Sequence, residues 1–212
     1  MNGEWGASVT AGRFAWIGTG LATVLLCAGC SGGAAARATS PRVLMQTDLG
    51  RIVVELDQAH APVTTANFLR YVAERRYAGA VFYRTVRLDN QPNDAVKIEV
   101  IQGGLGFAPN KQRLPPIRQE TTRKTGIHHL DGTLSMARIR PGSASSEFFI
   151  CIGDQPELDF GGRRNPDGQG FAAFGRVVEG MDVVREIHDR PAKGQLLTPP
   201  VRITAMRRLT TE

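Results

Sequence analysis

The sequence predicts a mainly β domain of about eight strands and two helices. Apolar residues alternate with polar ones over short segments bounded by Gly, Pro, Asn or Asp, a pattern typical of half-buried strands. Apolar residues recur at helical spacing after Pro62 and again after Gly180. With 212 residues, of which 42% are hydrophobic, the chain suits one globular domain preceded by a leader.

The folded part is expected to begin with a hairpin and a helix. Apolar residues alternate over residues 43–47 and 52–56, on either side of a turn at residues 48–50. Pro62 suits the first turn of a helix, because the N–H that it lacks would have no partner there. The spacing predicts that this helix turns one apolar face to the core, made of Ala66, Leu69, Ala73, Phe68 and Val72.

Two further strands are expected over Val81–Val86 and Val96–Ile101, the second leading into Gln102-Gly103-Gly104. The polar segment Arg87–Asp94 between them is rich in turn residues and is therefore a predicted loop. Residues 107–125 contain three prolines and are expected to be mostly loop.

The centre of the domain is a predicted strand pair over residues 134–138 and 145–152, joined by a turn at Pro141-Gly142. The second strand ends in a run of aromatic and β-branched residues, which favours a place inside a sheet. The remaining elements are a long loop over 159–170, a strand over 171–178, a helix over 180–188 with Met181, Val184 and Ile187 inward, and a strand over 201–209.

Six short motifs stand out along this pattern. They are Ala61-Pro62-Val63-Thr64-Thr65-Ala66-Asn67-Phe68, Phe82-Tyr83-Arg84, Gln102-Gly103-Gly104, the strand pair just described, Glu157-Leu158-Asp159 and Phe174–Met181. In content and order they resemble the cyclophilin family of peptidyl-prolyl isomerases, over nearly the whole chain after its leader. The resemblance implies a closed eight-stranded antiparallel barrel capped by two α-helices, which leaves few strand edges open.

The resemblance also implies an activity, the cis-trans isomerisation of X-Pro bonds, without cofactor or metal. The barrier to this rotation, about 18–20 kcal/mol, reflects amide resonance, and the twisted bond returns a lone pair to the prolyl nitrogen. A fixed cation near that nitrogen stabilises the twisted state more than either planar state. Phe82-Tyr83-Arg84 resembles the family's F-H-R, so Arg84 is the expected catalytic cation.

The substrate-binding residues are likewise implied by the resemblance. Phe149 would form the floor of a pocket for the proline ring, unless it is an ordinary core residue, with Leu158, Val100 and Phe171 as walls. Ala137 would border the substrate backbone, and Gln102 would hydrogen-bond the substrate carbonyl and orient Arg84. Because neighbours on a strand face opposite ways, we expect Phe148 to fill the barrel if Phe149 lines the cleft.

Several positions depart from the family pattern. Glu147 stands where the family usually has Gln, Arg138 where it has Asn, Phe171 where His is common, and Glu157 where an aromatic residue is usual. Arg138 and Glu147 are still expected to contact substrate. An ionised carboxylate accepts hydrogen bonds but donates none, and Glu147 is a candidate ion-pair partner for Arg84. Such a pair would weaken catalysis, which leaves open a chaperone or scaffold that binds proline segments with little turnover.

Residues 1–30 resemble a bacterial lipoprotein signal. Arg13 precedes the uncharged run Phe14–Cys27, and small residues then lead to Cys30, which would be acylated and become the new N-terminus. The alternative is an ordinary signal peptide cut near residues 34–36. Residues 31–41 contain no large apolar side chain and are expected to be a flexible tether to the domain at 42–212. We therefore expect export to the cell envelope or periplasm, a lipid anchor in the membrane, and folding exported proteins as clients.

Composition argues against several other classes of function. The net charge of +6 is spread along the chain rather than gathered in a stripe, so we expect no nucleic-acid partner. His128 and His129 would point to opposite faces if they lay on a strand, and no ligand cluster accompanies them, so no metal is expected. We also expect no internal disulfide, and a monomer that binds proline-containing polypeptides.

Overall fold

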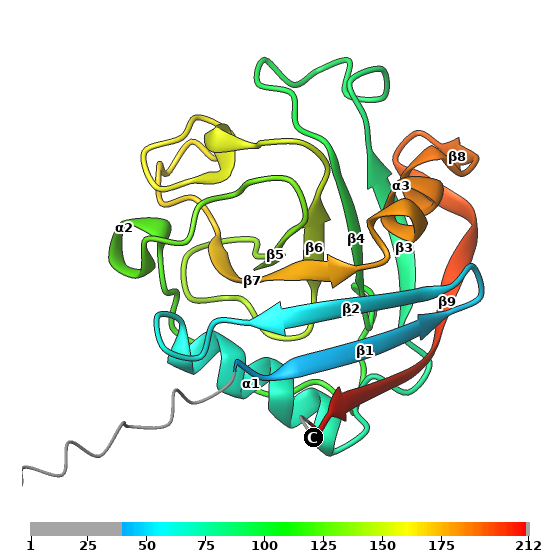
Figure 1. Cartoon of the computed structure of the whole chain (residues 1–212). Coiled ribbons are helices and arrows are strands. Elements are labelled where there is room, and N and C mark those ends of the chain that lie inside the picture. The colour runs from blue at the N-terminus through cyan, green and yellow to red at the C-terminus, as the bar shows by residue number, and fades with distance from the viewer. Residues whose placement is uncertain (1–39, 211–212) are drawn as a thin grey trace, which may run out of the picture. The chain divides into compact units, whose positions relative to one another are not determined.

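The computed structural model describes residues 40–210, in which an antiparallel sheet closes on itself (Figure 1). The order β1-β2-β7-β5-β6-β4-β3-β9 becomes a ring because β9 also pairs with β1, and the short β8 extends the sheet beside β9. The expected closed eight-stranded antiparallel barrel is therefore confirmed. The strands are β1 (Arg42–Thr47), β2 (Arg51–Leu56), β3 (Val81–Val86), β4 (Val100–Gly104), β5 (Thr133–Met136), β6 (Phe148–Cys151), β7 (Ala172–Glu179), β8 (Ala192–Lys193) and β9 (Leu196–Leu209).

The leader lies outside the described residues. The predicted signal peptide at 1–30, its Cys30 and most of the tether at 31–41 therefore stay predictions. Within residues 40–210, no helix is long and apolar enough to cross a membrane. Cys151 in this part of the chain is a buried free thiol.

Residues 40–210 contain three α-helices rather than two. The expected pair, α1 (Pro62–Ala73) and α3 (Met181–Asp189), lies at opposite ends of the barrel in Figure 1. The third, α2 (Thr122–Thr125), lies in the segment expected to be loop. Its four residues are too few to show an apolar period, so the sequence pattern could not reveal it.

The buried face of α1 differs from the expected one. Phe68 and Val72 are buried as expected, but Ala66 and Ala73 are exposed, and Tyr71 is buried in their place. The two aromatic side chains remove more apolar area from water than two alanines would, and they set the rotation of the helix. α3 agrees better with the prediction, since Val184 and Ile187 are both fully buried.

A distant carboxylate caps the N-terminus of α1. Ala61 offers no side-chain cap, but Glu120 accepts hydrogen bonds from the backbone N–H groups of Val63 (3.2 Å) and Thr64 (2.8 Å) and from the Thr64 hydroxyl (2.8 Å). The negative charge also complements the positive end of the helix dipole. This cap ties the helix to the loop that precedes α2.

Strand β4 begins at Val100, so the expected strand over Val96–Glu99 was wrong. The reason is Gln91, whose buried side chain hydrogen-bonds to both the backbone carbonyl and the backbone N–H of Ile98. Its Nε2 donates to the Ile98 carbonyl at 2.8 Å, and its Oε1 accepts from the Ile98 N–H at 3.2 Å. Because the segment at residues 87–98 is hydrogen-bonded to itself here, it does not join the sheet before Val100.

Aromatic rings fill the barrel interior. Phe148 lies with its ring centroid 5.6 Å from Phe68, 5.7 Å from Tyr77 and 5.7 Å from Phe82, each pair in an edge-to-face arrangement. Phe149, its neighbour on β6, belongs to a separate apolar cluster outside the barrel. The expected alternation along β6 is confirmed, and it directs Phe149 to the outer surface, where it lines a cleft.

Candidate active site

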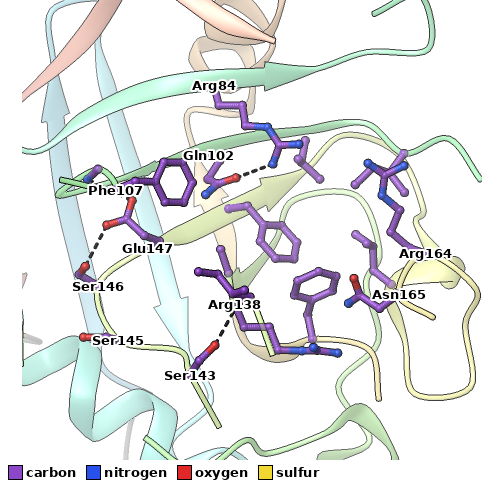
Figure 2. Close-up of a pocket in the computed structure, with 18 of the residues that line it drawn as sticks. Arg84, Gln102, Phe107, Arg138, Ser143, Ser145, Ser146, Glu147, Arg164 and Asn165 are labelled. Atoms are coloured by element: carbon purple, nitrogen blue, oxygen red, sulfur yellow. Dashed lines mark hydrogen bonds between the residues drawn. The ribbon is translucent and has the colours of Figure 1, made fainter. Parts of the chain in front are cut away.

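A cavity of about 410 Å³ lies on the outer face of β3, β4 and β6 (Figure 2). Its base is apolar, whereas its rim carries polar and charged side chains. Figure 2 shows Arg84 on one side of the pocket, Glu147 and Phe107 on a second, Arg138 on a third, and Arg164 with Asn165 on a fourth. The apolar lining residues are Ile98, Val100, Ala137, Phe149, Leu158 and Phe171.

The base of the cavity is built from two aromatic rings. The ring centroids of Phe149 and Phe171 lie 5.2 Å apart at an interplanar angle of 85°. The Arg138 guanidinium lies 5.2 Å from the Phe171 ring centroid, and it also makes a bidentate pair with Asp167, both N···O distances being 2.8 Å. Arg138 therefore fastens the loop at 159–170 against the aromatic base, and Phe171 is fixed from both sides.

Arg84 projects from β3 and is held by two glutamine side chains. Its Nη1 donates to Oε1 of Gln102 at 2.8 Å, and its Nε and Nη2 donate to Oε1 of Gln195 at 2.9 and 2.5 Å. Burial, together with the nearby charge of Arg164, lowers the pKa of Arg84. A guanidinium nevertheless stays protonated in proteins, so the site holds a fixed positive charge beside an apolar hollow.

Glu147 does not pair with Arg84, contrary to the sequence expectation. Its Oε2 accepts from the Tyr83 hydroxyl at 2.8 Å, and that hydroxyl accepts from Nε2 of Gln102 at 2.7 Å. Two residues therefore stand between the carboxylate and Arg84. Burial, reinforced by the charge of Glu147, raises the pKa of Tyr83 well above its ordinary value, which keeps the hydroxyl a donor.

Backbone groups hold Glu147 in place. The N–H groups of Leu105 and Gly106 donate to it at 3.0 and 3.2 Å, and the Ser146 hydroxyl donates at 2.9 Å. Gly104 permits this approach, because a Cβ there would lie 2.7 Å from the Glu147 carboxylate and the backbone has φ +140°. The Gln-Gly-Gly motif thus provides both the glutamine that holds Arg84 and the space for Glu147.

The two adjacent histidines support the cavity from beneath. His129 stacks on Phe149 at 5.8 Å between ring centroids, and its Nδ1 lies 2.6 Å from Oδ1 of Asp159. Its Nε2 lies 2.9 Å from the hydroxyl of the buried Ser135. Burial lowers the pKa of His129, whereas hydrogen bonds from the two histidines overcome the effect of burial and lower the pKa of Asp159.

His128 contacts the same carboxylate, with its Nδ1 2.7 Å from Oδ2 of Asp159. The expectation that the two rings point to opposite faces was wrong, because residues 128 and 129 precede the strand rather than lying on it. Among residues 40–210, no group of three or more His, Cys, Asp or Glu side chains is arranged to hold a metal ion. Both histidines instead contact the carboxylate of Asp159.

The chain was compared with known proteins. A family model described as cyclophilin type peptidyl-prolyl cis-trans isomerase/CLD matches residues 42–208. Peptidyl-prolyl cis-trans isomerase cyp18 of Streptomyces antibioticus is 41% identical over 149 residues, which cover 68% of this chain and 81% of that protein. The chain belongs to the cyclophilin-type peptidyl-prolyl cis-trans isomerase family.

Two further comparisons agree with this assignment. Peptidyl-prolyl cis-trans isomerase B of Escherichia coli K12 is 37% identical over 149 residues, covering 68% of this chain and 82% of that protein. A crystal structure of a cyclophilin-type isomerase from Cryptosporidium parvum superposes with a TM-score of 0.64 and covers 82% of this chain and 99% of that chain. At 19% identity this last likeness concerns the fold alone.

The structure brings all nine predicted catalytic and substrate-binding residues of this cyclophilin-type isomerase to one cavity. The set draws on several segments between residues 84 and 171, and the roles of its members stay predictions. They are Arg84, Val100, Gln102, Ala137, Arg138, Glu147, Phe149, Leu158 and Phe171. Glu157, where the family usually has an aromatic residue, instead pairs with Arg163 at 2.7 Å and does not line the cavity.

Sequence reasoning missed several residues of the site. Ile98 lines the cavity from the segment between β3 and β4, and Arg164 and Asn165 line it from the long loop at 159–170. These residues lie outside the six motifs, so no motif pointed to them. Gln195 was also missed, because its role depends on a contact across 111 residues of sequence.

Proposed function

We propose that this isomerase accelerates the rotation of X-Pro bonds in exported proteins as they fold in a bacterial cell envelope. The observation that carries the catalytic part is the fixed Arg84 guanidinium, held by uncharged amide oxygens at the edge of an apolar cavity. The cavity suits a proline ring, and the cation suits the nitrogen to which that ring belongs. No cofactor has a part in the proposal.

The proposed reaction needs no covalent step. The proline ring lies against Phe149, and the Arg84 guanidinium faces the prolyl nitrogen. As the bond twists, that nitrogen regains its lone pair and becomes a better acceptor, so the interaction with Arg84 strengthens on the way to the transition state. One such preorganised contact supplies about 3–4 kcal/mol, and exclusion of water by the apolar walls adds to it.

Gln102 has two tasks in this scheme. Its Oε1 accepts from Arg84, and one hydrogen of its Nε2 is donated to the Tyr83 hydroxyl at 2.7 Å. The second hydrogen on Nε2 is then available for the substrate carbonyl. Ala137 borders the same cavity and would pair its main chain with the substrate backbone, while Arg138 and Glu147 hold the surrounding loops.

The alternative function, a chaperone or scaffold with little turnover, depended on Glu147 neutralising Arg84. Glu147 is hydrogen-bonded to Tyr83 instead, and no carboxylate among residues 40–210 lies within ion-pairing distance of Arg84. The physical reason for weak turnover is therefore removed, and we favour the enzyme.

A protease-coupled assay with a proline peptide tests the activity. Arg84→Ala is expected to lower kcat/KM about 100- to 1000-fold, because it removes the cation that stabilises the twisted bond. Arg163→Ala is the matched control, since it also removes one arginine but lies outside the cavity. A wild-type rate no higher than that of Arg84→Ala would support the binding module instead.

The envelope location is supported by the leader sequence. An uncharged run after Arg13 that ends in Ala28-Gly29-Cys30 is typical of exported lipoproteins. Mass spectrometry of the mature protein should find an acylated Cys30 at the N-terminus, and Cys30→Ser should release the protein from the membrane fraction. A mature N-terminus near residues 34–36 without lipid would favour the ordinary signal peptide and a soluble envelope protein.

A further inference from the structure

Gln195 holds the proposed catalytic cation from the side opposite Gln102. It lies just before β9, and its Oε1 accepts from both Nε (2.9 Å) and Nη2 (2.5 Å) of Arg84. On the other side, Oε1 of Gln102 accepts from Nη1 of Arg84 at 2.8 Å. Two amide oxygens therefore occupy three of the guanidinium N–H directions, and the planar group has little freedom to rotate.

Gln195 is itself fixed by the segment that follows Arg84. Its Nε2 donates to the backbone carbonyl of Asn90 at 3.2 Å. The backbone carbonyl of Gln195 accepts from the N–H of Thr85 at 2.9 Å. The Asn90 side chain completes the arrangement by donating to the carbonyls of Thr85 (3.1 Å) and Gly194 (3.2 Å). The connection between β3 and β4 thus holds the side chain that holds Arg84.

We propose that Gln195 is a positioning residue for the isomerase reaction, and that its neutral amide is essential to that role. An aspartate or glutamate would hold a guanidinium more tightly, but its charge would compensate the positive charge that the prolyl nitrogen needs. A glutamine oxygen orients the group and leaves its charge available. The inference rests on the proposed function, in which Arg84 is the catalytic cation.

Two substitutions separate orientation from charge. Gln195→Ala removes the hydrogen bonds and is expected to lower kcat about tenfold with little change in KM, because the guanidinium is no longer held in place. Gln195→Glu keeps an acceptor in place but adds a negative charge. We expect it to lower kcat at least as much as Gln195→Ala, even though Arg84 is then held more firmly.

The experiment measures kcat and KM for wild type, both Gln195 variants, Arg84→Ala and the double variants, with thermal unfolding as a check on folding. Gln46→Glu on β1 is the matched control for the added charge, because Gln46 does not line the cavity. In the Arg84→Ala background, both Gln195 substitutions are expected to change the residual rate less than twofold, because Gln195 acts through Arg84.

Three results would overturn the inference. If Gln195→Ala keeps the wild-type kcat while Arg84→Ala loses it, Gln195 does not position the cation. If Gln195→Glu alone keeps the wild-type kcat, a neutral acceptor is not required. Equal losses with and without Arg84 would mean that Gln195 acts on folding. If Arg84→Ala itself is fully active, the proposed function of Arg84 fails first, which the same data set distinguishes from failure of Gln195 alone.

Discussion

The barrel interior and the outer cavity are built from the same kinds of residue but differ in how they are closed. Phe148 and Phe149 are neighbours on β6 and are 0% and 4% exposed. Around Phe148, three aromatic rings pack edge to face, whereas Phe149 lines a cavity of about 410 Å³. Arginine and glutamine side chains form the rim of that cavity. Close apolar packing stabilises the fold, whereas apolar side chains around a cavity with a charged rim are suited to binding a ligand.

The largest difference should appear when each phenylalanine is truncated. Phe148→Ala removes a ring with three edge-to-face partners and is expected to cost about 3–5 kcal/mol of unfolding free energy. Phe149→Ala should cost less stability, because one side of its ring already faces the cavity, but it should abolish most of the proline-peptide turnover. Urea unfolding and the proline assay on both variants measure the two effects. If the two variants lost equal stability and equal activity, the assignment of Phe148 to stability and Phe149 to activity would be contradicted.

Substitution of Glu120 tests whether the end of the barrel under α1 contributes to stability alone, as we expect of the barrel interior. Glu120 is 7% exposed, and its carboxylate accepts three hydrogen bonds from the first turn of α1. Glu120→Ala is expected to lower the unfolding free energy by about 2–3 kcal/mol, because two backbone N–H groups and a hydroxyl lose a charged acceptor. Turnover per folded molecule should not change, because Glu120 does not line the cavity. A selective loss of kcat would show that the two regions are coupled through α1.

The His129–Asp159 pair lies where the two regions meet, and it should make the unfolding free energy fall as the pH is lowered. The lowered pKa of His129 means that the folded state resists protonation, so below about pH 6.5 the unfolded chain takes up a proton that the folded one does not. The lowered pKa of Asp159 adds a second loss at lower pH, as that carboxylate is protonated in the folded state. Each proton contributes a slope of at most about 1.4 kcal/mol per pH unit.

Urea unfolding between about pH 7.5 and 5.5 measures this slope. His129→Gln should flatten it, because the buried titrating ring is gone. His60→Gln is the control, since His60 is exposed and lies outside the cavity lining. Turnover should decline along with stability in the wild type, because His129 stacks directly on Phe149. A wild-type slope that His129→Gln leaves intact would place the titrating group elsewhere.

The sequence allowed prediction of elements and residues that carry a local signal. The hairpin of β1 and β2, strand β3 and helix α3 have regular apolar periods, and seven of the nine site residues lie in short motifs, the exceptions being Val100 and Phe171. Contacts between segments that are far apart in sequence were not predictable. Gln91 ends the β4 ladder early, and Glu147 is separated from Arg84 by Tyr83 and Gln102. These outcomes depend on which side chains lie close enough to hydrogen-bond in the folded structure, and neither an apolar period nor a short motif carries that information.

The smallest expected effect concerns the contact between the two long loops, which belongs to the cavity alone. Arg164 donates from Nη1 to the carbonyl of Val96 at 2.6 Å and from Nη2 to Asp94 at 3.2 Å, and so joins the loop at 159–170 to the segment at 87–98. Asp94→Asn should change the unfolding free energy by less than about 1 kcal/mol, because Asp94 is 41% exposed and the pair is screened by water. It should raise KM about threefold, because the loosened Arg164 no longer holds that wall of the cavity.

Asp89→Asn in the same segment is the control, since Asp89 is 77% exposed and does not contact Arg164. A change in stability without a change in KM would assign this contact to the fold, and the cavity wall would then owe its shape to the packing of Phe171 and Leu158.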